Sequence, residues 1–178
     1  MYELDEEINN NKEFQEIISD IITNDTVLKM KNYKQHYDTN CFEHCMHVAF
    51  YSYILCKKYN LDYKSAARAG MLHDLFLYDW RIRSSSRKGF HAFTHPKCAL
   101  TNALSLFNLN DKEQDIIIKH MWPLTLKLPK YKESFIITFV DKYCALSESY
   151  SVYFKRFFNK KYCRYAYLFL CIWIARII

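Results

Sequence analysis

The segment Met71-Leu-His-Asp-Leu-Phe76 places a histidine and an aspartate side by side inside an otherwise apolar stretch. Burying an ionised aspartate without a partner is costly, so Asp74 needs a cation or several hydrogen-bond donors beside it. Asp141 presents the same problem at the end of Ile137-Thr-Phe-Val-Asp141. Two carboxylates inside apolar helical runs are better explained by one charged centre than by two separate accidents.

Outward from this segment, the chain is predicted to form successive helices with short connections. Asp62 can cap the helix that carries the segment, and Asn40 and Asn110 each precede a glutamate by three residues, as in a capping box. Pro96 suits the first position of a helix, which puts His95 at its mouth. The predicted helices run from about Leu4 to Ile22, Asn40 to Tyr59, Asp62 to Tyr78, Pro96 onward, Asn110 to His120 and Lys132 to Glu148, with a basic loop over Asp79 to Thr94. We therefore expect an all-α fold, a single-domain bundle of six to seven helices.

The composition excludes several other classes of protein. The chain has 178 residues, the size of one domain, and only two glycines and three prolines. These are too few for the glycine loops that hold phosphate in Rossmann and P-loop folds, or for the turns of sandwiches and barrels. Hydrophobic residues make up 51% of the chain, which is ample for a core. Seven cysteines without a Cys-x-x-Cys pair, and no visible secretory signal, predict a cytoplasmic protein without a disulfide framework.

Three parts are expected along the chain: residues 1-35 as a helical lead-in, 36-148 as the core, and 149-178 as a basic, aromatic tail in the same domain or at an interface. Much of the net charge of +6 lies in the basic loop and this tail. The uncharged run Tyr165–Ala175 has eleven residues, about 16 Å as a helix, and is too short to cross a bilayer core of about 30 Å. It is either a last core or homodimer-forming helix or a peripheral membrane contact, and no stable complex with nucleic acid is expected. In the membrane alternative, the following bases would face lipid headgroups: Lys155, Arg156, Lys160, Lys161 and Arg164.

Metal-competent side chains recur along the chain at intervals of about one helix plus its connection. They are His44, His73, Asp74, His95, His120 and Asp141. An antiparallel bundle can bring one ligand per helix to a common centre. Imidazole and carboxylate ligands suit Fe, Mn, Zn, Co or Ni better than calcium, so one or two divalent ions of this kind are predicted. His36, His47 and His91 stay outside the predicted ligand set.

The ordered set from His44 through His73-Asp74 to Asp141 resembles the ligand signature of the HD superfamily of metal-dependent phosphohydrolases. The similarity covers about residues 36 to 148. It implies that a metal-activated water attacks a phosphate ester or anhydride of a small phosphorylated molecule, with a nucleotide as the expected class. His95 and His120 make the chain similar to the subgroup that binds two metals, which includes phosphodiesterases and nucleotide hydrolases. That resemblance implies a first metal on His44, His73, Asp74 and Asp141, a second on His95 and His120, Asp74 bridging, and His73 and Asp74 as the catalytic residues.

The substrate contacts are less sharply predicted than the metal ligands. Arg68, Arg81 and Lys142 are candidate cations for the phosphoryl charge, although a lone basic side chain is more often solvated surface. Trp122 can stack on a base or simply pack in the core. Two alternatives to the leading function stay open. One is a single-metal nucleotidase in which His95 is dispensable, and the other is a non-catalytic metal- and nucleotide-binding sensor whose tail contacts a membrane or a partner.

Overall fold

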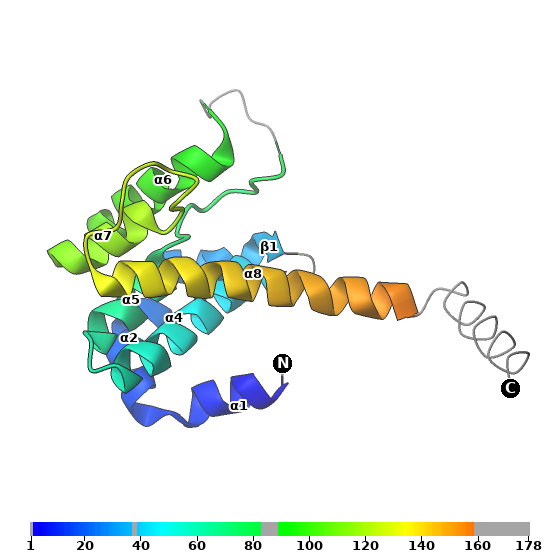
Figure 1. Cartoon of the computed structure of the whole chain (residues 1–178), viewed down its shortest axis with the longest axis horizontal. Helices are drawn as coiled ribbons and strands as arrows, with labels where there is room; N and C mark the ends of the chain where they lie inside the picture. Colours follow the sequence, from blue (N-terminus) through cyan, green and yellow to red (C-terminus); the bar gives the residue numbers. More distant parts are fainter. Residues whose placement is uncertain (1, 37–38, 83–88, 159–178) are drawn as a thin grey trace, which may run out of the picture.

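The computed structural model describes residues 2–36, 39–82 and 89–158 (Figure 1). Over these residues the chain forms eight α-helices, one 3-10 turn and one small antiparallel sheet of two strands. The elements are α1 (Tyr2–Asn10), α2 (Lys12–Ile22), α3 (Asp25–Leu28), η1 (Lys29–Asn32), β1 (Lys34–His36), β2 (Thr39–Asn40), α4 (Cys41–Lys58), α5 (Tyr63–Leu72), α6 (His91–Leu106), α7 (Asp111–Lys119) and α8 (Lys132–Phe158). The predicted all-α helical bundle is confirmed.

Helix α4 lies at the centre of the bundle, packed mainly on α5 and α8. In Figure 1, α6 and α7 lie above α8, and α1 and α2 lie below it. Helices α4 and α5 approach closely where a Cβ added to Gly70 would stand 2.8 Å from the Cα of Ala49. Glycine at this position therefore lets the two helices that carry His44 and His73 pack backbone to backbone.

The predicted helix starts are confirmed where a capping side chain marks them. The Asn40 side chain accepts a hydrogen bond from the Glu43 backbone N–H at 2.9 Å, and the Glu43 carboxylate accepts one from the Asn40 backbone N–H at 3.2 Å, which completes a capping box. Asn110 and Glu113 repeat this arrangement at the start of α7. Asp62 accepts from the Ser65 backbone N–H at 3.0 Å and caps α5.

Two predicted helices have different bounds at the N-terminal side of the molecule. The helix expected from Leu4 to Ile22 is two helices, because Asn11 accepts a hydrogen bond from the Phe14 backbone and starts α2 anew. The helix expected to reach Tyr78 ends at Leu72. Leu75 and Phe76, which follow the helix, are buried in a turn that a hydrogen bond from the Phe76 N–H to the Asp74 carbonyl holds at 2.8 Å. Their apolar pattern in the sequence is the same as that of a buried helix face, and the helix was therefore predicted to be too long.

Two further bounds differ at the C-terminal side. Helix α6 begins at His91 rather than at Pro96, which is buried inside the helix, so His95 lies in the helix and not at its mouth. Thr94 donates its hydroxyl to the Phe90 carbonyl at 3.1 Å and supports this early turn. Helix α8 continues beyond the predicted end at Glu148 to Phe158. The short elements from α3 to β2 were not predicted.

Within the described part of the chain, no helix combines the length and the apolar character needed to cross a membrane. The predicted apolar run Tyr165–Ala175 lies outside the described residues, as do Lys160, Lys161 and Arg164. Lys155 and Arg156 fall in the last turns of α8, where only the backbone is described.

Candidate metal centre

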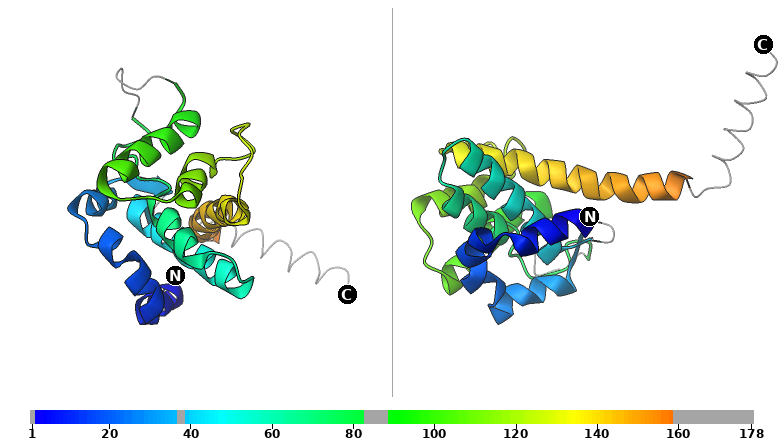
Figure 2. Two further views of the ribbon diagram at one scale, coloured as in Figure 1. Left: turned by 90° about the vertical axis from the view of Figure 1, so that its left-hand side faces the viewer. Right: turned by 90° about the horizontal axis from the view of Figure 1, so that it is seen from below.

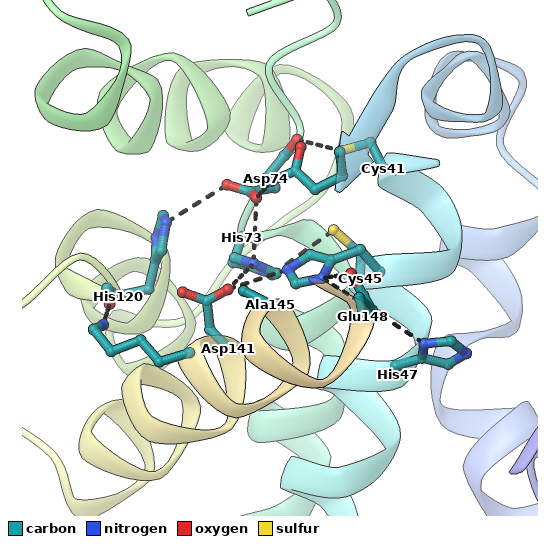
Figure 3. Close-up of polar contacts among 12 residues, drawn as sticks. Cys41, Cys45, His47, His73, Asp74, His120, Asp141, Ala145 and Glu148 are labelled. Atoms are coloured by element: carbon teal, nitrogen blue, oxygen red, sulfur yellow. Dashed lines mark hydrogen bonds and ion pairs between the residues drawn. The ribbon is translucent and has the colours of Figure 1, made fainter. Parts of the chain in front are cut away.

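All six predicted ligands meet in one buried cluster between α4, α6, α7 and α8. His44 comes from α4, His95 from α6 and Asp141 from α8, whereas His73 and His120 are the residues that cap the C-terminal ends of α5 and α7. Figure 3 shows His73, Asp74, His120 and Asp141 pointing toward one another. The bundle thus brings together side chains that are far apart in sequence.

Three of the four histidines are held in the same way by the backbone. The Nδ1 of His73 lies 2.7 Å from the Gly70 carbonyl oxygen, that of His95 lies 2.8 Å from the His91 carbonyl, and that of His120 lies 2.8 Å from the Ile117 carbonyl. A carbonyl oxygen only accepts, so each Nδ1 carries the proton and donates it. In the neutral form of each ring, Nε2 then presents a lone pair toward the cluster, the arrangement expected of a metal-binding imidazole.

The inward-facing atoms are crowded. The Nε2 atoms of His95 and His120 are 2.8 Å apart, so two lone pairs face each other when both rings are neutral. Within the described residues, the buried Nε2 of His73 and Oδ1 of Asp74 have no hydrogen-bond partner. Asp74 Oδ1 also lies 3.2 Å from the Nε2 of His95 and 3.5 Å from that of His120. Buried acceptors with so few donors call for positive charge, supplied either by a metal ion or by protons on the imidazoles.

His44 is held by a side chain that the sequence prediction missed. Its Nε2 lies 3.1 Å from Asp141 Oδ1, and its Nδ1 lies 3.1 Å from both carboxylate oxygens of Glu148. Glu148 follows Asp141 by seven residues, which is two helical turns, so both acids lie on one face of α8. That spacing was the available signal. Gln35, on β1, donates to Asp74 Oδ2 at 2.5 Å, and no sequence pattern indicated this contact.

The carboxylates and the burial of the site control its protonation. Burial opposes charge on His44, but hydrogen bonds to Asp141 and Glu148 raise the pKa of His44 well above its ordinary value. The pKa of His73 is also raised, against burial, by Cys45 and the two aspartates. Burial and the neighbouring histidines lower the pKa of His120 to about 3. In the absence of a metal, these acids therefore favour the protonated forms of His44 and His73.

The donor atoms form two groups that share His73. One contains His44, His73 and Asp141, the other contains His73, Asp74 and His120, and within each group the ligand atoms lie within 4.8 Å of one another. All are imidazole nitrogens or carboxylate oxygens, the ligands of transition metals such as Zn, Mn and Fe. These buried groups could hold a metal ion, and their unpartnered atoms fit one.

The predicted substrate contacts are not gathered at the cluster in the same way. Arg68 pairs with Asp20 at 2.6 Å and Glu113 at 3.3 Å, and the Arg81 guanidinium pairs with Asp79 at 2.8 Å. These guanidinium groups are held by acids away from the metal-competent groups. Lys142 does reach the cluster, because its Nζ donates to the His120 carbonyl at 3.3 Å. Trp122 packs edge-on against Phe135 at 5.5 Å between ring centroids.

The remaining histidines lie around the centre. His47 contacts Glu148 at 3.5 Å and Asp5 at 3.4 Å, on the side away from Asp74 (Figure 3). His91 stacks on His95 with ring centroids 4.5 Å apart, and its Nδ1 lies 3.1 Å from the Tyr78 hydroxyl. The side chain of His36 lies outside the described residues. His47 and His91 thus support ligand-bearing elements from outside the two metal-competent groups.

Comparisons with known proteins assign no family to this chain. Protein-family models, curated proteins and solved structures all gave no match. The functional argument therefore depends on the chemistry of the buried centre.

Proposed function

We propose that this protein is a divalent-metal-dependent phosphohydrolase of the kind found in the HD superfamily. The observation that carries the proposal is the pair of buried, unpartnered atoms His73 Nε2 and Asp74 Oδ1, inside a cluster whose imidazoles turn their lone pairs inward. Such a donor set is built for a cation and is costly without one. The order of the ligands along the chain, which resembles that superfamily, supports the choice of phosphate chemistry.

The two metal-competent groups support one or two divalent ions of Fe, Mn, Zn, Co or Ni. His44, His73 and Asp141 would hold the first ion together with Asp74, and His95 and His120 would hold the second. Asp74 has one oxygen 3.5 Å from His73 and the other 3.2 Å from His95, a position that supports a bridging role. A divalent metal bound here would supply an activated water and a Lewis acid for a phosphoryl oxygen.

The chain's own residues orient these groups and the substrate. His73 and Asp74, as ligands in contact with the reacting atoms, are the proposed catalytic residues. Lys142, half-buried beside His120, is the best placed of the proposed cations to bind a phosphoryl oxygen. We propose a small phosphorylated molecule, a nucleotide, as substrate. In this structure Arg81 pairs with Asp79 and Trp122 packs on Phe135. Each would contact the substrate only after its segment of chain turned toward the metal centre.

Metal analysis of the purified protein, combined with a phosphoester substrate panel, tests this function. We expect one to two transition metals per chain and hydrolysis that is lost in His73→Ala and Asp74→Asn. Asp111→Asn, at an exposed aspartate on α7, is the matched control and should keep both metal and turnover. Metal-free protein whose hydrolysis is indifferent to the first two substitutions would contradict the proposal.

The number of metals is tested separately at His95. In a two-metal enzyme, His95→Ala should lower the metal content toward one per chain and reduce turnover strongly, because His95 Nε2 lies 2.8 Å from His120 Nε2, a member of the second group. Unchanged metal content and turnover would instead support the single-metal nucleotidase. Tight nucleotide binding without any turnover would support the non-catalytic sensor.

A further inference from the structure

Helix α8 presents two different faces. Its inner face carries Asp141, Cys144 and Glu148, which are buried against the centre of the bundle. Its outer face carries a row of large apolar side chains, here called the α8 stripe: Phe139, Tyr143, Leu146 and Tyr150, which are 64%, 60%, 71% and 65% exposed. Single exposed apolar residues are ordinary, but a continuous row on one helix marks an interaction surface.

The spacing of the α8 stripe identifies the shape of its partner. Its members follow one another at steps of four, three and four residues, which is the heptad spacing of a coiled-coil seam. In the sequence, Tyr153 and Phe157 continue the same spacing within the bounds of α8. A seam with this period fits the side chains of another helix better than it fits a flat surface or a pocket.

The position of α8 leaves this seam accessible. The helix has 27 residues and is therefore about 40 Å long. Figures 1 and 2 show its C-terminal part running out from the body of the molecule. Among the described elements, α4, α5, α7 and β1 pack on α8, and the Tyr143 ring also meets Tyr51 of α4 edge-on, with centroids 5.9 Å apart. The exposed part of each stripe side chain, 60–71%, remains open to a second chain.

We propose that the α8 stripe is a homodimer interface, in which α8 packs against α8 of a second copy of this chain. One face can serve both partners, because a two-fold interface uses the same patch on each subunit. Ser147 and Ser149, which flank the stripe on either side, are small and uncharged and allow close approach. Lys142 does not oppose pairing, because its Nζ is turned to the Thr138 and His120 carbonyls.

The exposed area matches the requirement of a specific dimer. Four large side chains of which about two-thirds is exposed leave roughly 500 Å² per chain. Pairing two stripes would thus bury about 1,000 Å², the lower bound for a specific interface.

Sedimentation equilibrium of the full chain over a series of concentrations tests the interface. We expect twice the chain mass of 21.5 kDa, with dissociation on dilution. The double variant Leu146→Asp, Tyr150→Asp should have the mass of one chain at every concentration. Leu104→Asp, at a 47% exposed leucine on α6, is the matched control and should remain dimeric. Circular dichroism checks that both variants keep the helical content of the native chain.

Three results would overturn the proposal. A native chain that is monomeric at every concentration and stays in the supernatant with anionic phosphatidylserine vesicles would show that the chain covers its own stripe. Monomer that sediments with these vesicles, when the double variant does not, would make the stripe a membrane surface. A dimer that survives the double substitution would place the interface elsewhere.

Discussion

Glu148 positions His44 without belonging to either metal-competent group. Both of its oxygens lie 3.1 Å from His44 Nδ1, so it holds the ring with Nε2 directed at Asp141. Residues that orient a ligating histidine typically contribute 10–100-fold to metal affinity. We expect Glu148→Ala to weaken Zn²⁺ or Mn²⁺ binding by about that factor, and Glu148→Gln, which keeps an acceptor oxygen, to weaken it less.

Isothermal titration of the metal-free protein measures this effect. Glu133→Gln is the matched control, because Glu133 is a buried glutamate on the same helix that binds Lys112 at 2.8 Å rather than a histidine. Glu133→Gln should lower stability and leave metal affinity unchanged. Equal affinities for the native chain and Glu148→Ala would exclude the positioning role, whereas a native chain that binds no metal would instead contradict the metal centre itself.

Metal binding is also expected to depend on pH. The acids around His44 and His73 raise the pKa of both imidazoles and so favour their charged forms in the metal-free protein. A metal binds the neutral ring and must displace those protons. Affinity should therefore rise with increasing pH, and binding should release protons. Titrations in buffers of different ionisation enthalpy count the released protons, and a count of zero would contradict the prediction.

At the scale of elements, Gly70 sets the packing of α4 on α5. The Cβ of an alanine there would meet the Ala49 Cα at 2.8 Å and its N at 3.1 Å, both backbone atoms. Overpacking typically costs about 1–3 kcal/mol, against which the better helix propensity of alanine returns about 1 kcal/mol. We expect Gly70→Ala to lower the free energy of unfolding in urea. Because the obstacle is backbone, Ala49→Gly should not restore it, and a stabilised Gly70→Ala would refute this account of the packing.

The elements that sequence predicted well are those with a local chemical signal. Asn40 with Glu43, and Asn110 with Glu113, start their helices as predicted, because a capping box is completed within one turn of chain. The end of α5 at Leu72 was missed, because buried apolar residues in a turn and on a helix face have the same composition. Pro96 was predicted to start a helix, but it lies inside α6, where it is buried. The packing around a buried proline is not visible in the local sequence.

In the metal centre too, the residues with a local sequence signal were predicted and those without one were missed. The six residues that gather in the buried cluster were predicted, because a charged or imidazole side chain inside an apolar run stands out in the sequence. Gln35 was not, because a polar residue on a short strand has no such contrast and its contact with Asp74 spans the fold. The ion pairs that hold Arg68 were equally invisible, since Asp20 lies on another helix.

At the scale of the whole molecule, the centre links helices from both ends of the chain. His44 lies on α4, near the N-terminal side, and Asp141 on α8, near the C-terminal side, so a metal held between them opposes unfolding of the entire bundle. A ligand that binds only the folded state, present at a free concentration of 100 times its Kd, stabilises that state by about 2.7 kcal/mol. For a chain of this size that corresponds to a rise of about 5–10 °C in Tm. We expect this rise when Zn²⁺ or Mn²⁺ is added to chelator-treated protein, and its loss in Asp74→Asn. Melting curves recorded with metal, with chelator and with metal restored measure it, and a Tm that metal leaves unchanged in the native chain would show that the cluster is satisfied by protons alone.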